Sequence, residues 1–298
     1  MATYDGRQWM SEQIHSILAQ EGVDVFIKIA DDGSNDGTRE LITQEWAAHP
    51  RLSVLLRVSG SGSAGANFRR MYRESDVAGF DYVALADQDD IWLPGKLRAG
   101  VTALASGSAH GYSCGVRPFW PDGREKDVLQ CPIARAADFL FEGAGQGCTY
   151  VMTTALFQRV NKFCTENVEL SERLHYHDWL VYLLARSWGM TWHFDATPWI
   201  RYRQHLGNEI GSRGSFGAIT RRLGMIRNGW YRNQVASAVD IAASITHDDP
   251  LLNKFSILFK QHPNLLRKLR LFVFVVAHGR RRLSDRMVLG FSALAGWI

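Results

Sequence analysis

The chain has 298 residues, of which 46% are hydrophobic and 21% charged, so it can bury the core of one large α/β domain with an appendage, or of two small domains. Its formal net charge of +4 is unevenly distributed: residues 221–298 hold 13 Lys or Arg and four Asp or Glu, a charge of +9, and residues 1–220 carry −5. A basic tail of this kind suggests contact with an anionic surface, either a membrane or a nucleic acid.

The cysteines and the apolar runs exclude several classes of protein. The four cysteines lie 16 or 17 residues apart without a C-x-x-C pair, which argues against a zinc knuckle or a redox motif and favours reduced thiols in a cytosolic compartment. No basic start followed by an apolar run opens the chain, so we expect no secretory signal. The longest late apolar runs, residues 271–277 and 287–298, are shorter than the roughly 20 residues that a spanning helix needs.

The first predicted elements alternate between helix and strand. Residues 2–6 look like the turn after a strand, and apolar residues at helical spacing then predict an amphipathic helix over residues 7–20. β-Branched residues predict a strand over residues 25–30, followed by the acidic loop 31–38 and a helix over residues 39–48. A carboxylate in this loop could accept hydrogen bonds from a nucleobase imide and ribose hydroxyls; the alternative is a capped turn.

A third strand over residues 52–58 leads through the glycine-rich segment 60–68 into another helix. The segment matches neither a G-x-G-x-x-G pattern after a first strand nor a P-loop with its lysine. A dinucleotide site or a kinase-type phosphate site is therefore not supported.

The fourth strand, residues 82–86, stops abruptly at an Asp-Gln-Asp-Asp sequence, residues 87–90. Because ligands lie beyond the carboxyl ends of strands in open α/β sheets, Asp87 and Asp89 should project into a ligand crevice. Two carboxylates at alternate positions suit a hard divalent cation that also binds substrate phosphates, so we interpret them as a metal-diphosphate clamp. The alternative is an acidic turn that caps the helix opening at Pro94. The alternation of four strands with helices predicts a doubly wound parallel sheet with both acidic loops on the same edge.

Four short motifs follow one another in this region: Ala2-Thr3-Tyr4-Asp5-Gly6, Asp31-Asp32-Gly33-Ser34-x-Asp36-x-Thr38, Ala66-Asn67-Phe68 and Asp87-Gln88-Asp89-Asp90-Ile91-Trp92-Leu93-Pro94-x-Lys96. In order and spacing they resemble the family 2 inverting glycosyltransferases, and within these the bacterial rhamnosyltransferase-type enzymes of surface-polysaccharide assembly. The resemblance covers about residues 1–211. It implies an α/β fold of the nucleotide-diphospho-sugar transferase (GT-A) type, a Rossmann-like sheet with a C-terminal helical basic extension.

The resemblance also implies a role for each matching loop. The Thr3-Tyr4 turn, with Asp31 or Asp32, would hold the base and ribose of a nucleotide-sugar. The acidic residues 87–90 would address the ribose, the diphosphate and Mg²⁺ or Mn²⁺. The family has an apolar strand before the Thr-Tyr turn, central in its sheet, and this chain starts too late to contain it. We expect either that the true start lies upstream or that the sheet lacks a middle strand.

The next predicted elements are a strand over residues 112–120 and a glycine-rich loop over residues 143–150, followed by a helix to Cys164. In the family a loop like this lies beside the acceptor and the donor sugar. The alternative is a flexible connection whose glycines contact no ligand.

Asp178 is the candidate for the chemistry. Leucines recurring on a helical face place it near the start of a mostly buried helix, where a lone Asp is usually a cap. The His177-Asp178-Trp179 pattern, however, matches the place where the family keeps its catalytic base. Inversion at an anomeric carbon needs one carboxylate to take the acceptor hydroxyl proton, and a metal makes protonation of the departing diphosphate unnecessary. We assign Asp178 as the base and His177 to shaping the site. A zinc site with His175 is disfavoured because no three-ligand helical motif is present.

Residues 190–194 predict a strand, and residues 198–205 then lead into 206–211. The Tyr-Arg-Gln-His stretch ending at His205 again resembles the rhamnosyltransferase-type proteins. Arg203 or His205 could meet the diphosphate or the metal; the alternatives are a structural arginine on an edge strand and a surface histidine. The expected nucleotide-sugar contacts are thus Thr3, Tyr4, Asp31, Asp32, Asn67, Asp87 and Arg203, and the expected metal ligands are Asp89, Asp87 and His205.

The chain from about residue 215 is predicted to be helical and basic, so we expect a catalytic domain over residues 1–215 and an extension over 216–298. Residues 265–274 interleave cations with large apolar side chains, and Arg280-Arg281-Arg282 add a cluster. Interfacial attachment to anionic lipid would suit an enzyme whose acceptor is lipid-linked; the alternative is a helical appendage with a solvated basic face. No recognised module frames the charges for nucleic-acid binding, so no nucleic-acid partner is expected.

These observations predict a metal-dependent inverting glycosyltransferase, cytoplasmic and peripheral on the inner face of the cell membrane. It would move a sugar, with rhamnose as the first guess, from a dTDP- or UDP-sugar to a lipid-linked or growing surface glycan. A sugar-nucleotide pyrophosphorylase is the alternative enzyme, but no glycine-rich basic signature stands near the N-terminus. A non-catalytic nucleotide-sugar-binding scaffold is the other alternative, and the joint presence of Asp87, Asp89 and Asp178 argues against it.

Overall fold

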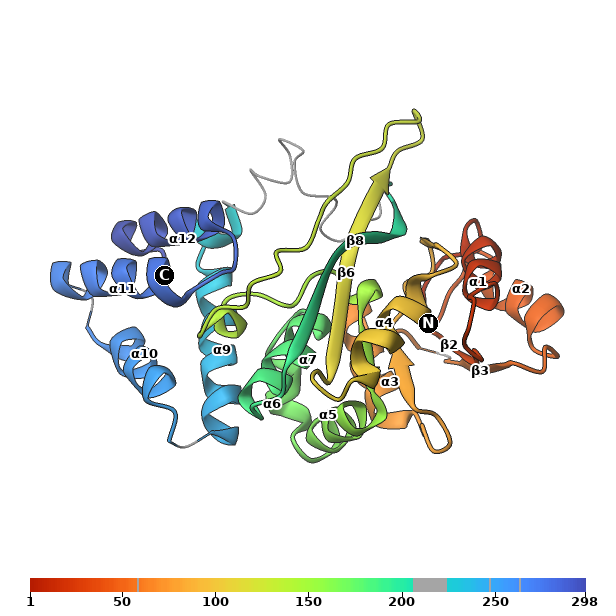
Figure 1. Ribbon diagram of the computed structural model, residues 1–298, viewed down its shortest axis with the longest axis horizontal. Coiled ribbons are helices and arrows are strands. Elements are labelled where there is room, and N and C mark those ends of the chain that lie inside the picture. The colour runs from red at the N-terminus through yellow and green to blue at the C-terminus, as the bar shows by residue number, and fades with distance from the viewer. Residues whose placement is uncertain (58, 206–223, 247, 263) are drawn as a thin grey trace. The chain divides into compact units, whose positions relative to one another are not determined.

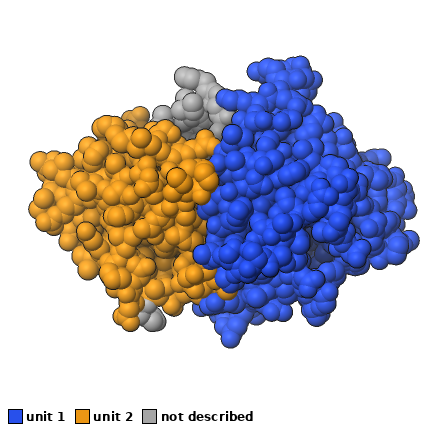
Figure 2. Space-filling view, in the orientation of Figure 1, with its two compact units in different colours: residues 1–130, 145–168, 191–208 blue, residues 131–144, 169–190, 209–298 orange. Residues whose placement is uncertain are grey.

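The computed structural model describes residues 1–57, 59–205, 224–246, 248–262 and 264–298, so the expected site segment 206–211 lies outside the described residues. The chain forms two compact units (Figure 2). Unit 1 comprises residues 1–130, 145–168 and 191–208, and unit 2 comprises residues 131–144, 169–190 and 209–298. This division does not coincide with the boundary expected near residue 215, because two segments from the middle of the chain belong to the helical unit.

Unit 1 begins with a parallel three-stranded sheet of order β1-β2-β3. The strands are β1 (Ala2–Thr3), β2 (Ile27–Asp31) and β3 (Leu52–Leu56), and the helices after them are α1 (Met10–Leu18), α2 (Thr38–Leu41) with its π-helical continuation Ile42–Trp46, and α3 (Ala64–Glu74). Ala2 lies opposite Ala30, so the two-residue β1 occupies the position before the Thr-Tyr turn where we expected no strand. β2 runs directly into the first acidic loop at Asp31.

A second, mixed sheet of order β4-β7-β6-β8-β5 completes unit 1. Its two long strands, β6 and β8, run side by side (Figure 1). Its strands are β4 (Tyr82–Ala84), β5 (Ile91–Trp92), β6 (Gly111–Phe119), β7 (Val151–Thr153) and β8 (Trp192–Arg203), and its helices are α4 (Lys96–Ala105) and α5 (Thr154–Glu166). The prediction that residues 82–86 add a fourth strand to the parallel sheet is wrong, because β4 belongs to the second sheet and pairs antiparallel with β7. β1 is too short to offer β4 a ladder, and Ala2 N donates a single hydrogen bond to Ala86 O at 3.1 Å.

The apolar core of unit 1 draws on both sheets. Ile14 from α1, Ile29 from β2 and Val116 from β6 are fully buried in one cluster, together with side chains from α4. Burial of each such side chain contributes about 1.5–3 kcal/mol, so the core fixes the strands whose ends carry the acidic loops. The two acidic loops are therefore held by a packed scaffold and not by their own hydrogen bonds alone.

Unit 2 is helical. Its helices are α7 (His177–Ser187), α9 (Trp230–Ile245), α10 (Pro250–Lys260), α11 (Leu265–His278) and α12 (Leu283–Ala295), with a 3₁₀ turn over Asp138–Leu140. The short α6 (Val168–Glu172) has its first residue in unit 1 and the others in unit 2. Every residue from Trp179 to Ala185 is buried, so the middle of α7 is enclosed on all sides. Among the described residues, none of the helices is both long and apolar enough to cross a membrane.

Candidate active site

One side chain, Gln88, joins the Thr-Tyr turn to the second acidic loop. Its Oε1 accepts hydrogen bonds from Thr3 Oγ1 at 2.6 Å and from Tyr4 N at 2.8 Å, and its Nε2 donates to Tyr4 O at 2.9 Å. The side chain of Tyr4 remains 55% exposed and can stack on a planar ligand. The turn and residues 87–90 therefore form one surface element.

Asp31 and Asp32 use their carboxylates differently. Asp31 is fully buried; its Oδ2 accepts two backbone N–H groups of its own turn, each at 3.1 Å, and its Oδ1 accepts the Ser34 hydroxyl. Asp32 reaches across to the glycine-rich loop, where its Oδ2 accepts Ser61 N at 2.8 Å and Ser61 Oγ at 2.7 Å. Arg70 Nη1 lies 3.3 Å from the Oδ1 of Asp32. Asp31 thus shapes the turn, and Asp32 connects it to a second loop.

Asn67 lies behind the first acidic loop. Its Nδ2 donates to Ala30 O at 3.1 Å, and it is buried on α3. This bond ties α3 to the last residues of β2. The Oδ1 of Asn67 has no hydrogen-bond partner among the residues that the structure describes.

The end of β8 returns to the second acidic loop. His205 Nε2 lies 2.7 Å from Asp89 Oδ2, and the imidazole stacks on the Trp9 ring with a centroid distance of 4.2 Å. Arg203 Nε donates to Asp89 O at 2.9 Å, and its Nη2 donates to Glu12. The sequence left open whether Arg203 and His205 lie at the site. The structure places both side chains in contact with Asp89 of the second acidic loop.

A buried group of polar side chains lies under the acidic loop. Asp87, Asp90 and Cys148 each offer an atom within 4.8 Å of the others. Asp90 is 1% exposed, its carboxyl lies beside the Cys148 thiol, and burial, with the neighbouring acidic charges, raises its pKa well above the usual range. Lys96 is also buried, with Nζ 3.1 Å from the Trp92 ring centroid, and burial lowers its pKa to about 8.

A hard divalent cation fits the partly exposed side chains of Asp87, Asp89 and His205 and does not fit Cys148. Burial raises the pKa of the Cys148 thiol well above its usual value, so the thiol stays protonated, and the metal ligand is the thiolate. Asp87, Asp89 and His205 are only partly buried and supply carboxylate oxygens and an imidazole nitrogen. Such donors suit Mg²⁺ or Mn²⁺.

Asp178 belongs to unit 2 and lies in the first turn of α7. Its Oδ1 accepts a hydrogen bond from the backbone N–H of the next residue, Trp179, at 2.7 Å, and the side chain is partly exposed. Trp179 Nε1 donates to Phe139 O at 2.7 Å, and His175 N donates to Gln234 Oε1 at 2.6 Å. Contacts on both sides of Asp178 thus fix the start of the helix that presents its carboxylate.

Sequence reasoning missed the glutamines that build this site. Besides Gln88, Gln13 Nε2 donates to Asp87 O at 3.1 Å, and Gln20 Oε1 accepts Leu97 N at 2.9 Å near the start of α4. A signal was available, because Gln13 and Gln20 follow Met10 and Ile17 by three residues and so lie on the apolar face of the first helix. Nothing in the local pattern distinguished Gln88 from a spacer between two aspartates.

Comparison with known proteins places these loops in a family. The family model "Glycosyl transferase family 2" matches residues 1–157, which include the Thr-Tyr turn and both acidic loops. The dTDP-rhamnosyl transferase RfbG of Shigella flexneri is 36% identical over 254 residues, 85% of this chain and 86% of the relative. The putative teichuronic acid biosynthesis glycosyltransferase TuaG of Bacillus subtilis (strain 168) is 28% identical over 151 residues, 50% of this chain and 58% of the relative.

Solved structures share the fold. TarS 1–349 of S. aureus, in complex with UDP-GlcNAc, has a TM-score of 0.53 and 14% identity, covering 99% of this chain and 89% of that chain. The mannosyltransferase PcManGT of Pyrobaculum calidifontis, in complex with GDP-Man and Mn²⁺, has a TM-score of 0.50 and 16% identity, covering 99% and 84%. The α/β fold of the GT-A type is therefore confirmed. The chain belongs to glycosyl transferase family 2 and is a glycosyltransferase.

Proposed function

We propose that this glycosyltransferase moves a sugar, rhamnose in the first instance, from a dTDP- or UDP-sugar to a lipid-linked or growing surface glycan, by a metal-dependent inverting reaction. The main support for nucleotide-sugar binding is that Gln88 joins the Thr3-Tyr4 turn to the second acidic loop by three hydrogen bonds. The identity with a relative named dTDP-rhamnosyl transferase supports dTDP and rhamnose as the first choices. The acidic side chains and the arginine at this loop support a nucleoside diphosphate-sugar as the donor.

The nucleotide would bind along the carboxyl ends of β1, β2 and β4. The exposed Tyr4 ring offers a stacking surface for the base, and a carboxylate of the first acidic loop can accept the imide N–H. Asp87 would accept the ribose hydroxyls. The Arg203 guanidinium offers N–H donors that fit diphosphate oxygens. In this arrangement the nucleotide would contact Tyr4, Asp32, Asp87 and Arg203, while the buried side chains of Thr3, Asp31 and Asn67 would hold the turns that present them.

Asp89, with Asp87 and His205, would hold the metal. A bound Mg²⁺ or Mn²⁺ neutralises the charge that develops on a departing nucleoside diphosphate. His205 is kept in place for this by its stack on Trp9, and the backbone of Asp89 is fixed by Arg203. Asp90 and Lys96 are buried under the loop, and we do not assign them as metal ligands.

Asp178 would act as the general base. It takes the proton of the acceptor hydroxyl while the acceptor oxygen bonds to the anomeric carbon and the bond from that carbon to the diphosphate breaks. One base on the face opposite the leaving group gives inversion. The first turn of a helix suits an ionised carboxylate, because the helix dipole favours negative charge there.

A membrane surface is the proposed location of the acceptor. On α11, Leu265, Leu266 and Leu269 are exposed beside Arg270, which is the pattern of an interfacial helix. The Arg280-Arg281 pair of the expected basic cluster does not belong to this surface, because both residues bind Glu142 inside unit 2. The proposed lipid contact is therefore the exposed face of α11 and not the arginine cluster.

The test is release of nucleoside diphosphate from dTDP-rhamnose and from UDP-sugars, with and without EDTA. We expect turnover with Mg²⁺ or Mn²⁺ that EDTA abolishes, faster with dTDP-rhamnose, and an inverted anomeric configuration in the NMR spectrum of the product. Tight nucleotide binding without any turnover would favour the scaffold alternative. Retention of configuration would remove the single-base mechanism.

A further inference from the structure

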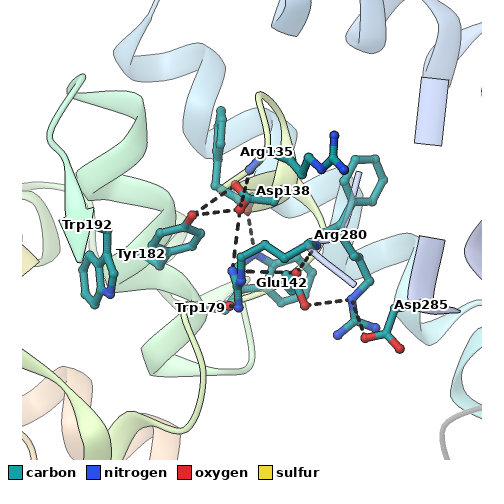
Figure 3. Close-up of polar contacts among 12 residues, drawn as sticks. Arg135, Asp138, Glu142, Trp179, Tyr182, Trp192, Arg280 and Asp285 are labelled. Carbon is teal, nitrogen blue, oxygen red and sulfur yellow. Dashed lines mark hydrogen bonds and ion pairs between the residues drawn. The ribbon is translucent and has the colours of Figure 1, made fainter. Parts of the chain in front are cut away.

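A buried polar cluster in unit 2 has no part in the reaction proposed above. Asp138 is fully buried and accepts hydrogen bonds from the Tyr182 hydroxyl at 3.0 Å, from Arg186 Nη1 at 2.8 Å and from Arg135 N at 3.1 Å (Figure 3). Arg186 Nη1 also lies 2.6 Å from the Tyr182 hydroxyl. A buried carboxylate is tolerated only with such partners, so the cluster sets one arrangement of these side chains.

The cluster extends to the C-terminal helices. Arg281 Nη1 lies 3.6 Å from Asp138 Oδ2, and Arg281 N donates to Glu142 Oε1 at 2.6 Å. Arg280 Nε donates to Glu142 Oε2 at 3.0 Å, as Figure 3 shows. Arg281 Nη2 adds a bond to Gly143 O at 2.9 Å. The connection between α11 and α12 is thus bonded to residues 138–143.

Helix α7 carries both the cluster and the candidate base. Tyr182 and Arg186 follow Asp178 by four and eight residues, so all three side chains lie along one face of the helix. The 3₁₀ turn that begins at Asp138 also accepts the indole N–H of Trp179, the residue after the base, at Phe139 O. The 3₁₀ turn is therefore hydrogen-bonded to α7 at Trp179, beside the candidate base, and again at Tyr182 and Arg186, one and two turns further along.

We propose that Asp138 is a positioning residue for Asp178, and that Arg281 makes the last two helices part of the same support. This inference rests on the proposed function, because it takes Asp178 as the base. A buried ion cluster contributes little net stability, but moving one partner away leaves the other charge buried and unpaired, which disfavours other arrangements of these side chains. The rate of a proton transfer depends steeply on the placement of the base, and a displacement of about 1 Å can lower it on the order of 100-fold.

Four variants test the role. Asp138→Asn keeps the shape of the side chain and removes its charge, and Tyr182→Phe removes one hydroxyl as a milder change. Arg281→Met removes the cation, and Arg281→Lys restores it. The matched control is Arg267→Met, because Arg267 is equally buried in unit 2 but donates to Leu258 O and Phe259 O, away from α7 and residues 138–143.

The readout is the ratio of glycosyl transfer to donor hydrolysis, with kcat normalised to the nucleotide-binding fraction of each sample. Loss of folded protein lowers transfer and hydrolysis together, whereas a displaced base lowers transfer more, since water tolerates poorer geometry than a bulky acceptor. We expect Asp138→Asn to lower normalised kcat for transfer about 10- to 100-fold with donor KM within about twofold. We expect Tyr182→Phe and Arg281→Met to lower it about 3- to 10-fold, with recovery in Arg281→Lys, and no change of the ratio in Arg267→Met.

The outcomes separate this inference from the proposed function. If Asp178→Asn still transfers sugar, the base assignment fails and the inference fails with it. If Asp178→Asn is inactive but Asp138→Asn and Tyr182→Phe keep the ratio of the parent enzyme, the base stands and the positioning role is overturned. If Arg267→Met lowers the ratio as much as Asp138→Asn, the effect is one of stability and the positioning role is likewise overturned.

Discussion

The two units use carboxylates in different ways. In unit 1, Asp89 is partly exposed, and its Oδ2 lies 2.7 Å from His205 Nε2. In unit 2, Asp138 and Glu142 are buried and each is bonded to arginine side chains. A carboxylate that remains accessible can bind a cation, whereas a buried carboxylate that is paired holds neighbouring elements together. The difference fits the proposed roles, in which unit 1 binds the donor and unit 2 holds the helix that begins at Asp178.

The contrast predicts that the largest effect on turnover comes from unit 2. Asp178→Asn should lower kcat for transfer on the order of 1000-fold, because proton removal by a placed base contributes about 10²–10⁴-fold. The dissociation constant for dTDP should change less than about twofold, because the proposed donor-binding residues belong to unit 1. Steady-state kinetics and calorimetric titration measure the two quantities. A variant that transfers at a near-normal rate removes Asp178 as the base.

The next largest effect should come from the acidic loop. Asp89→Asn should weaken Mn²⁺-dependent dTDP binding and lower kcat/KM about 100-fold, because the amide removes the charge that faces the cation. Asp81→Asn is the matched control, since Asp81 is an exposed acidic residue just before β4. Titration of dTDP with and without Mn²⁺ gives the answer. Equal metal dependence in Asp89→Asn and the parent protein would break the assignment of the loop.

A smaller effect should separate binding from catalysis inside unit 1. Gln88→Leu loses the three hydrogen bonds to the Thr-Tyr turn and should raise the donor KM about tenfold, with a loss of about 1–3 kcal/mol in the free energy of unfolding. We expect kcat to change much less, because the base is untouched. Urea unfolding and steady-state kinetics test this together. An unchanged KM would mean that the turn does not contact the nucleotide.

The smallest effect concerns the exposed face of α11. Arg270→Gln should weaken binding to vesicles that contain anionic lipid about fivefold, since one cation near such a surface contributes about 1 kcal/mol. Leu266→Ser should weaken binding to the same vesicles and also to neutral ones, and neither change should alter kcat on a soluble acceptor. Vesicle sedimentation measures both. Equal sedimentation of variants and parent protein would sink the lipid contact.

The strands and loops of the proposed donor site could be located from the sequence because their determinants are local. The apolar residues of β2 are followed at once by Asp31, and the helical spacing of Met10, Ile14 and Ile17 marks α1. Strand ends and helix faces depend on neighbours in sequence. The two acidic loops and the family resemblance could therefore be read from the chain.

The remaining features depend on pairings between distant residues. The antiparallel partner of β4 lies about 70 residues further along, so a sequence pattern could not place β4 outside the parallel sheet. The two-residue strand β5 pairs with Ile200 and Arg201 and leaves no periodic signal. Arg280 and Arg281 read as a surface cluster because their partner Glu142 is 138 and 139 residues away. Charge pattern shows where cations are, and only the fold shows whether they are already paired.

Titration of dTDP, in the presence of Mn²⁺, against the parent protein, Asp89→Asn and Asp178→Asn tests the two proposed roles together. We expect Asp178→Asn to bind as tightly as the parent protein although it does not transfer sugar, and Asp89→Asn to lose the metal-dependent part of the affinity. If Asp178→Asn lost binding and Asp89→Asn kept it, the division into a donor-binding unit and a base-presenting unit would be contradicted.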